Sequence, residues 1–216
     1  MARRRIRKVK IGRLFTVLFL VGLIFALGYI AVNKFSSKNQ NATKVKEISK
    51  IDGYDYSLRE DATDYYKKLF KKLSKTLKTD DVDMDEYASL VSEMFVCDFF
   101  NLNNKSSKND VGGVQFVYKE YQSDFEKFAM DSIYKSVLNN VYGNRRQKLP
   151  IVSKVTVSKG ENSSFKYGEN TDSNAYNFTF KIEYTEDDGY QDSGSLILIH
   201  SGKKIEVASM SDKSSN

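Results

Sequence analysis

The distribution of hydrophobic and polar residues divides the chain into stretches of different character. The first is a run of nineteen residues, Leu14 to Val32, that contains no charged side chain. A helix rises about 1.5 Å per residue, so this run would be about 28 Å long, close to the ~30 Å hydrocarbon core of a bilayer. We therefore predict one transmembrane helix over residues 14–32. Its membrane-anchor residues include Leu14, Phe19, Leu23, Leu27 and Val32.

From about residue 56 onward, apolar residues recur at steps of three and four, which is typical of amphipathic helices. A first helix is predicted from Ser57, as its N-cap, to Leu77, with a lysine-rich face opposite the apolar one. A second is predicted over Met84 to Phe99 and a third over Ser123 to Asn140, separated by a polar loop and a short strand, Val114 to Tyr118.

After Pro150 the period shortens to two, and from Tyr176 to Tyr184 apolar and polar residues alternate without error. Such alternation indicates strands with one buried face and one solvated face. Further strands are predicted from about residue 151, over Gly194 to His200 and over Lys204 to Met210. The predicted fold class is therefore α+β, with about three helices packed on a curved antiparallel sheet of four to five strands.

These patterns predict five segments. They are a basic cytoplasmic head (1–13), a transmembrane helix (14–32), a polar tether (33–55), an extracytoplasmic α+β domain (56–210) and a tail (211–216). The domain has about 155 residues, enough for one hydrophobic core but too few for two comfortable ones.

The charges around the apolar run predict its orientation. The head carries seven cations and no acid, whereas the fifteen residues after Val32 carry four lysines. Positive residues are retained on the cytoplasmic side, so we expect the N-terminus inside, the domain outside and a location in the cell membrane. The head is also expected to contact anionic lipid. Its cations are Arg3, Arg4, Arg5, Arg7, Lys8, Lys10 and Arg13.

The net charge of +6 and pI of about 9.1 do not indicate nucleic-acid binding. Without the seven cations of the head, 27 cations face 28 acids, so the rest of the chain is nearly neutral. We therefore expect no nucleic-acid partner.

A cleaved signal peptide is the main alternative to an anchor, because Ala26-Leu27-Gly28 has a small-x-small pattern. The apolar run is longer than the usual ~7 to 15 residues of a signal peptide and continues beyond that site, which favours an uncleaved anchor. The single cysteine, Cys97, cannot form an internal disulfide, so packing must hold the domain together.

The sequence predicts no catalytic, cofactor-binding or metal-binding residue. His200 ends a strand with no evident partner, and Cys97 lies in an apolar stretch, where a thiol behaves as a small hydrophobe. Gly112-Gly113 lacks the context of a phosphate-binding loop, so we interpret it as a tight turn into a strand.

Two groups of acids partly resemble calcium sites. Asp81, Asp83 and Asp85 match the first ligand positions of an EF-hand, but Glu86 and Ser92 occupy the positions that require Gly and Glu. We interpret these acids as helix-start residues. The acids around Gly189 form a soluble hairpin tip, with weak calcium binding as the alternative: Asp187, Asp188 and Asp192.

In architecture, the order helix, helix, short strand, helix and long antiparallel strands resembles the nuclear transport factor 2-like cone. A basic head, one membrane span and such a domain also resemble the inner-membrane assembly subunit of type IV secretion and conjugation systems. The resemblance covers the chain end to end but includes no motif, so it carries over no site residue. It implies a structural role in a membrane-spanning assembly.

We therefore expect a non-enzymatic interaction or assembly module in a secretion, conjugation or cell-envelope complex. Its expected partners are the lipid bilayer and other membrane or envelope proteins, with a homo-oligomer as one form. The alternative is a small-molecule-binding or isomerase-like cone at the membrane surface, in which an acid such as Asp98 or Asp131 faces a pocket. The lysine-rich helix face is expected to be a solvated surface, with an acidic partner or lipid as the alternative.

Overall fold

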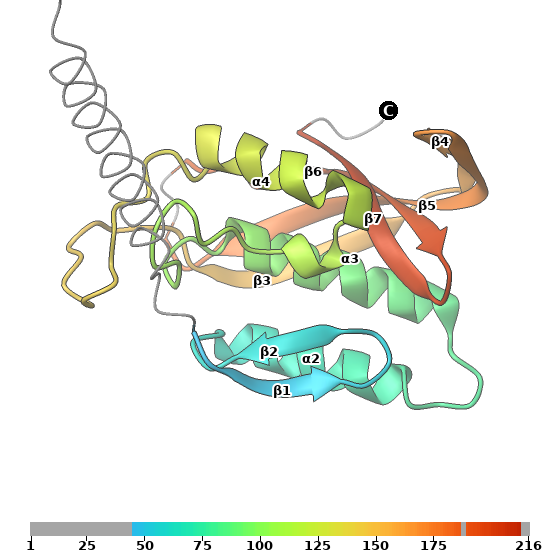
Figure 1. Cartoon of the computed structure of the whole chain (residues 1–216), viewed down its shortest axis with the longest axis horizontal. Helices are drawn as coiled ribbons and strands as arrows, with labels where there is room; N and C mark the ends of the chain where they lie inside the picture. Colours follow the sequence, from blue (N-terminus) through green and yellow to red (C-terminus); the bar gives the residue numbers. More distant parts are fainter. Residues whose placement is uncertain (1–44, 187–188, 213–216) are drawn as a thin grey trace, which may run out of the picture. The chain divides into compact units, whose positions relative to one another are not determined.

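Three α-helices pack against a curved antiparallel sheet of five strands in the computed structural model, which describes residues 45–186 and 189–212 (Figure 1). The predicted α+β class and the antiparallel sheet are confirmed. The predicted head, anchor and the first part of the tether lie outside the described residues, as does the end of the tail.

The domain begins with a hairpin of two antiparallel strands, β1 (Glu47–Ile51) and β2 (Tyr56–Arg59). The prediction of a tether up to residue 55 is therefore wrong for β1, and the folded unit starts at about residue 45. Only the last residue of β1, Ile51, is buried, so this strand shows no alternation in the sequence. In β2, Tyr56 and Leu58 are buried and alternate with half-buried neighbours.

Helix α2 (Asp64–Thr76) starts seven residues later than the predicted N-cap at Ser57, which lies in β2. Thr63 is the N-cap, and its hydroxyl accepts a hydrogen bond from the backbone N–H of Tyr66 at 3.2 Å. The sequence prediction extended the helical period backward because Leu58 fits both a helical stripe and the period-two pattern of β2.

Helix α3 (Met84–Phe100) matches its prediction within one residue and is the central helix of the domain. Asp83 caps it, its carboxylate accepting from the backbone N–H groups of Asp85 and Glu86 at 3.0 Å each. This confirms Asp83 and Asp85 as helix-start residues, whereas Asp81 lies in the preceding turn. Eleven of the seventeen residues are buried, because α2 covers one side of α3 and the sheet covers another.

The segment after α3 differs most from its prediction. Residues 114–118 were predicted as a strand, but they hold a 3-10 turn, η1 (Val114–Phe116), and a single bridge from Val117 to Val207. A second 3-10 turn, η2 (Lys119–Tyr121), leads into α4 (Gln122–Asp131), which ends nine residues before the predicted Asn140. The helix stops because Tyr134 turns into the core, where its ring is fully buried.

The sheet is built around the long strand β5 (Asn170–Tyr184), in the order β3-β5-β6-β7 with β4 paired to the first half of β5. The other strands are β3 (Val152–Lys159), β4 (Ser163–Tyr167), β6 (Ser193–Ser201) and β7 (Lys204–Ser211). β4 was not predicted, because the β4–β5 hairpin is largely exposed and shows no alternation. Register shifts in the β3, β4 and β7 pairings accompany the curvature of the sheet.

Candidate functional site

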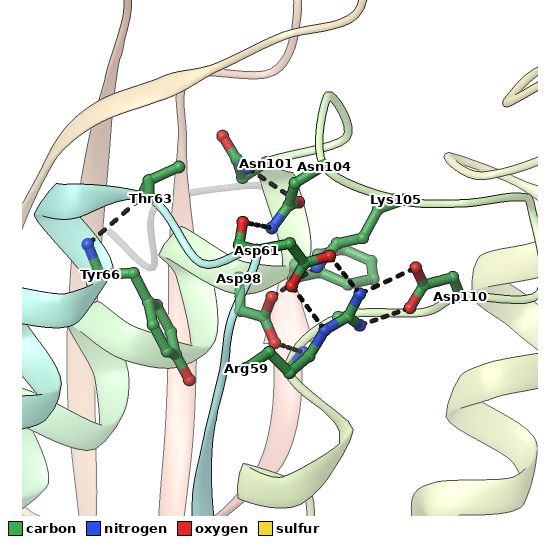
Figure 2. Close-up of polar contacts among 12 residues, drawn as sticks. Arg59, Asp61, Thr63, Tyr66, Asp98, Asn101, Asn104, Lys105 and Asp110 are labelled. Carbon is green, nitrogen blue, oxygen red and sulfur yellow. Dashed lines mark hydrogen bonds and ion pairs between the residues drawn. The ribbon is translucent and has the colours of Figure 1, made fainter. Parts of the chain in front are cut away.

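The most concentrated group of polar contacts in the domain is a charged cluster formed by Arg59, Asp61, Asp98, Lys105 and Asp110 (Figure 2). These residues come from β2, from the connection to α2, from α3 and from the loop after α3. Each charged side chain of the cluster forms an ion pair with another member, and these pairs hold the four segments together.

Arg59 lies between two carboxylates and uses its whole guanidinium fork (Figure 2). Toward Asp61, Nε donates at 3.0 Å and Nη2 at 2.7 Å; toward Asp110, Nη2 donates at 3.1 Å and Nη1 makes a second, shorter bond. Bidentate pairs of this kind are the strongest form of ion pair in proteins and also fix the orientation of both partners. Arg59 therefore joins β2 to the loop that carries Asp110.

Lys105 and Asp98 form the second pair, and the Lys105 side chain has no exposed surface. The other carboxylate oxygen of Asp98 accepts from the backbone N–H of Gly113 at 2.7 Å. A Cβ atom on Gly112 would lie 2.1 Å from the backbone oxygen of Asp98 and 2.7 Å from Lys105 Nζ, so only glycine fits there. The Gly112-Gly113 pair, predicted as a turn into a strand, instead allows the loop to approach Asp98.

The contacts between Arg59 and its carboxylate partners shift the pKa values of Asp110 and Arg59. Burial raises the pKa of Asp110, but the hydrogen bonds and positive charge of Arg59 outweigh burial and hold this pKa below its ordinary value. For Arg59, burial lowers the pKa, and the hydrogen bonds to Asp110 and Asp61 more than reverse that effect and raise it. Arg59 and Asp110 therefore stabilise each other's charged form.

Two buried tyrosines complete the polar layer beside the cluster. The Tyr134 hydroxyl donates to the backbone oxygen of Phe99 at 2.7 Å and accepts from the N–H of Gly112 at 3.0 Å. The Tyr66 hydroxyl accepts from Gln115 Nε2 at 3.0 Å. Burial raises the pKa of both tyrosines well above 10, so both are neutral hydrogen-bonding groups.

This geometry is suited to holding segments together rather than to acid–base chemistry. Lys105 has no surface that a substrate could reach, and Asp98 is already bonded to Lys105 and Gly113. Asp131, the other acid considered for a pocket, is exposed at the C-terminal end of α4. Asp98 is therefore engaged in the charged cluster, and Asp131 faces solvent.

His200 has a partner that the sequence did not reveal. Its Nδ1 lies 2.9 Å from a carboxylate oxygen of Asp172, which also accepts from the His200 backbone N–H at 2.7 Å. The imidazole lies 5.2 Å from the ring of Tyr176. Burial raises the pKa of Asp172, but hydrogen bonds from His200 and Asn174 lower it by more than burial raises it. The pKa of Asp172 is therefore below its ordinary value. The pair ties β6 to the first half of β5.

Cys97 does not form a nucleophilic pair with this histidine. The thiol is buried in α3, and burial raises its pKa to about 12, so it is protonated at neutral pH. Among the residues that the structure describes, no group of three or more His, Cys, Asp or Glu side chains is placed to hold a metal ion.

The exposed face of α2 carries a row of lysines. An open groove of about 800 Å³ runs along it and is lined by the α2 lysines, by Ser49 of β1 and by Leu58 and Phe70. We refer to the following lysines as the lysine face: Lys67, Lys68, Lys71, Lys72, Lys75 and Lys78.

No family model, no curated protein and no solved structure matches this chain. Within the part of the chain that the structure describes, the helices are too short or too polar to cross a membrane. The predicted anchor and basic head lie outside that part, and they remain predictions from the sequence.

Proposed function

We propose that the protein is a single-pass, membrane-anchored interaction module with no catalytic activity, whose C-terminal domain lies outside the cytoplasm. One observation carries this proposal: nineteen uncharged residues, Leu14 to Val32, follow a head with seven cations and no acid. This combination is typical of an uncleaved anchor with its N-terminus in the cytoplasm.

The chemistry of the domain supports a structural role. The charged groups that cluster beside α3 bind one another, and they join β2, α3 and the loop after α3. The only cysteine is buried and protonated, and the only histidine binds Asp172. We infer that the surface of this domain acts by binding other membrane or envelope proteins, including further copies of the same chain.

We further propose that the fold is a cone of the nuclear transport factor 2-like kind, and that the protein belongs to a secretion, conjugation or other envelope assembly. The supporting feature is the order of elements, with α2, α3 and α4 preceding a curved sheet whose central strand β5 is fifteen residues long. The resemblance remains one of architecture.

Alkaline extraction of membranes tests the anchor. We expect the full chain to stay in the membrane pellet and a variant with Phe19→Lys and Leu23→Lys to be released, because each lysine near the centre of a span costs about 2.5 to 3.5 kcal/mol. The matched variant with Phe19→Ala and Leu23→Ala is expected to remain. Release of the unmodified chain would contradict the proposal.

Crosslinking in intact membranes, followed by purification in mild detergent, tests the interaction. We expect the chain to be recovered in crosslinked species of higher mass. A protein that stays monomeric and without partners at every crosslinker concentration would rule out an interaction module while leaving the anchor intact.

A further inference from the structure

The lysine face forms one continuous stripe along α2. At 3.6 residues per turn, the five of its lysines that lie in α2 fall within an arc of about 140°, and the buried residues Tyr66, Leu69 and Leu73 fall on the opposite side. Lys78 lies two residues beyond the end of the helix. The helix thus presents its apolar side to the core and its cationic side to the groove.

Most of this positive charge is uncompensated. Lys67 lies 4.0 Å from Asp64, and Lys72 lies 3.3 Å from Glu86. The other four lysines form no ion pair with any residue of the described ranges; three of them lie in α2, within an arc of about 60° over about 11 Å of helix, and Lys78 follows the end of the helix. They are Lys68, Lys71, Lys75 and Lys78, all exposed.

Some of the other lysines on the surface of the domain are paired with acids. Lys154 pairs with Glu183 at 3.0 Å, and Lys159 pairs with Asp85 at 2.7 Å. Like charges at three- and four-residue spacing repel one another and weaken an isolated helix. A negatively charged partner bound to this face would offset the repulsion between its lysines.

A short segment of the sequence joins the predicted membrane span to the domain. Twelve residues, 33–44, separate the apolar run from the start of the described domain, and fully extended they reach at most ~40 Å. The strand that follows them, β1, lines the same groove as the lysine face through Ser49. The segment that leaves the predicted membrane span therefore leads directly to the cationic groove.

We propose that the lysine face binds the anionic phospholipid surface of the bilayer that holds the chain, an inference that rests on the proposed membrane anchor. The groove is open, and α2 contains no arginine that could grip a carboxylate with two hydrogen bonds. Flexible lysine side chains in a row suit a planar surface of negative headgroups, which attracts nearby cations.

Fluorescence quenching by lipids that carry a nitroxide on the headgroup tests the proposal. The full chain with Ser74→Cys is labelled within the groove, since Cys97 is buried and protonated and does not compete for the label. It is then reconstituted into vesicles of phosphatidylcholine alone or of equal parts phosphatidylcholine and phosphatidylglycerol. We expect stronger quenching in the anionic vesicles and its loss at 1 M salt, where the screening length falls to about 3 Å.

Two fourfold variants separate this face from overall charge. Replacing the four unpaired lysines by Gln is expected to reduce quenching to the phosphatidylcholine level. The control variant replaces four exposed lysines elsewhere by Gln: Lys119, Lys135, Lys166 and Lys181. It is expected to keep the stronger quenching in anionic vesicles.

Equal quenching in both vesicle types, or equal behaviour of the two variants, would overturn the inference. An acidic protein would then be the occupant to test. Carbonate extraction of the same vesicles separates the two failures: a chain that washes off refutes the anchor, whereas a chain that stays but ignores phosphatidylglycerol refutes only the lipid contact.

Discussion

At the scale of single residues, Lys105 is the least ordinary position in the domain. Its side chain carries a positive charge with no exposed surface, and Asp98 is the group that neutralises it. We expect Lys105→Met to lower the free energy of unfolding by about 3 to 5 kcal/mol, because it leaves Asp98 without its cation. Urea unfolding measures this. Lys108→Met, at an exposed lysine of the same loop, is the control and is expected to change stability by less than about 0.5 kcal/mol.

Asp110, in the same loop, is expected to make the stability of the domain depend on pH. Its pKa is held below the ordinary 3.8 chiefly by Arg59, in spite of burial, which raises it. A group with a depressed folded-state pKa stabilises the fold above its unfolded pKa, and this contribution is lost as pH falls through the folded value. Asp110→Asn is therefore expected to be less stable than wild type at neutral pH, with the difference shrinking below about pH 4.

Urea unfolding over a series of pH values measures the difference for Asp110→Asn. Asp131→Asn, at an exposed acid of α4, is the control and is expected to show no such trend. A difference for Asp110→Asn that stays constant from neutral to acidic pH would show that the ion pair with Arg59 is not its cause.

At the scale of elements, β1 decides where the folded domain begins. Ile51 is 3% exposed in this strand, whereas Ile48 is 47% exposed. We expect Ile51→Ala to cost about 2 to 5 kcal/mol of stability, because it leaves a cavity in the core. Ile48→Ala is expected to cost less than about 0.5 kcal/mol. Thermal melts of the two variants compare them directly, and similar losses would mean that β1 does not anchor the hairpin in the core.

The elements also show which parts of the fold were predictable. Long segments with a clean period, α3 and the second half of β5, were predicted within about one or two residues because burial repeats along them. β1 and β4 were missed because they are mostly exposed. The end of α4 was missed because Tyr134 leaves the helical pattern to bind Phe99, a contact across thirty-five positions.

The charged cluster was unpredictable for the same reason. Arg59 and Asp110 are fifty-one positions apart, and nothing near either residue indicates the other. The visible signal was Gly112-Gly113, where the backbone must come close to Asp98. That signal was interpreted as a local turn, because a single sequence does not show which distant residue a glycine approaches.

At the scale of the whole molecule, a folded domain follows an apolar segment that is proposed to be its membrane anchor. The domain supplies a core and paired charges, and the lysine face supplies the surface proposed to contact lipid. The proposed binding of envelope proteins depends on the domain lying outside the cytoplasm.

Cysteine labelling in intact cells most directly measures on which side of the membrane the domain and the head lie. Ser164→Cys lies on exposed β4, Ala2→Cys lies in the basic head, and the native Cys97 is buried and protonated. With a maleimide that does not cross membranes, we expect Ser164→Cys to be labelled in intact cells and Ala2→Cys only after permeabilisation. Labelling of Ser164→Cys only in permeabilised cells, or of Ala2→Cys in intact ones, would contradict the account.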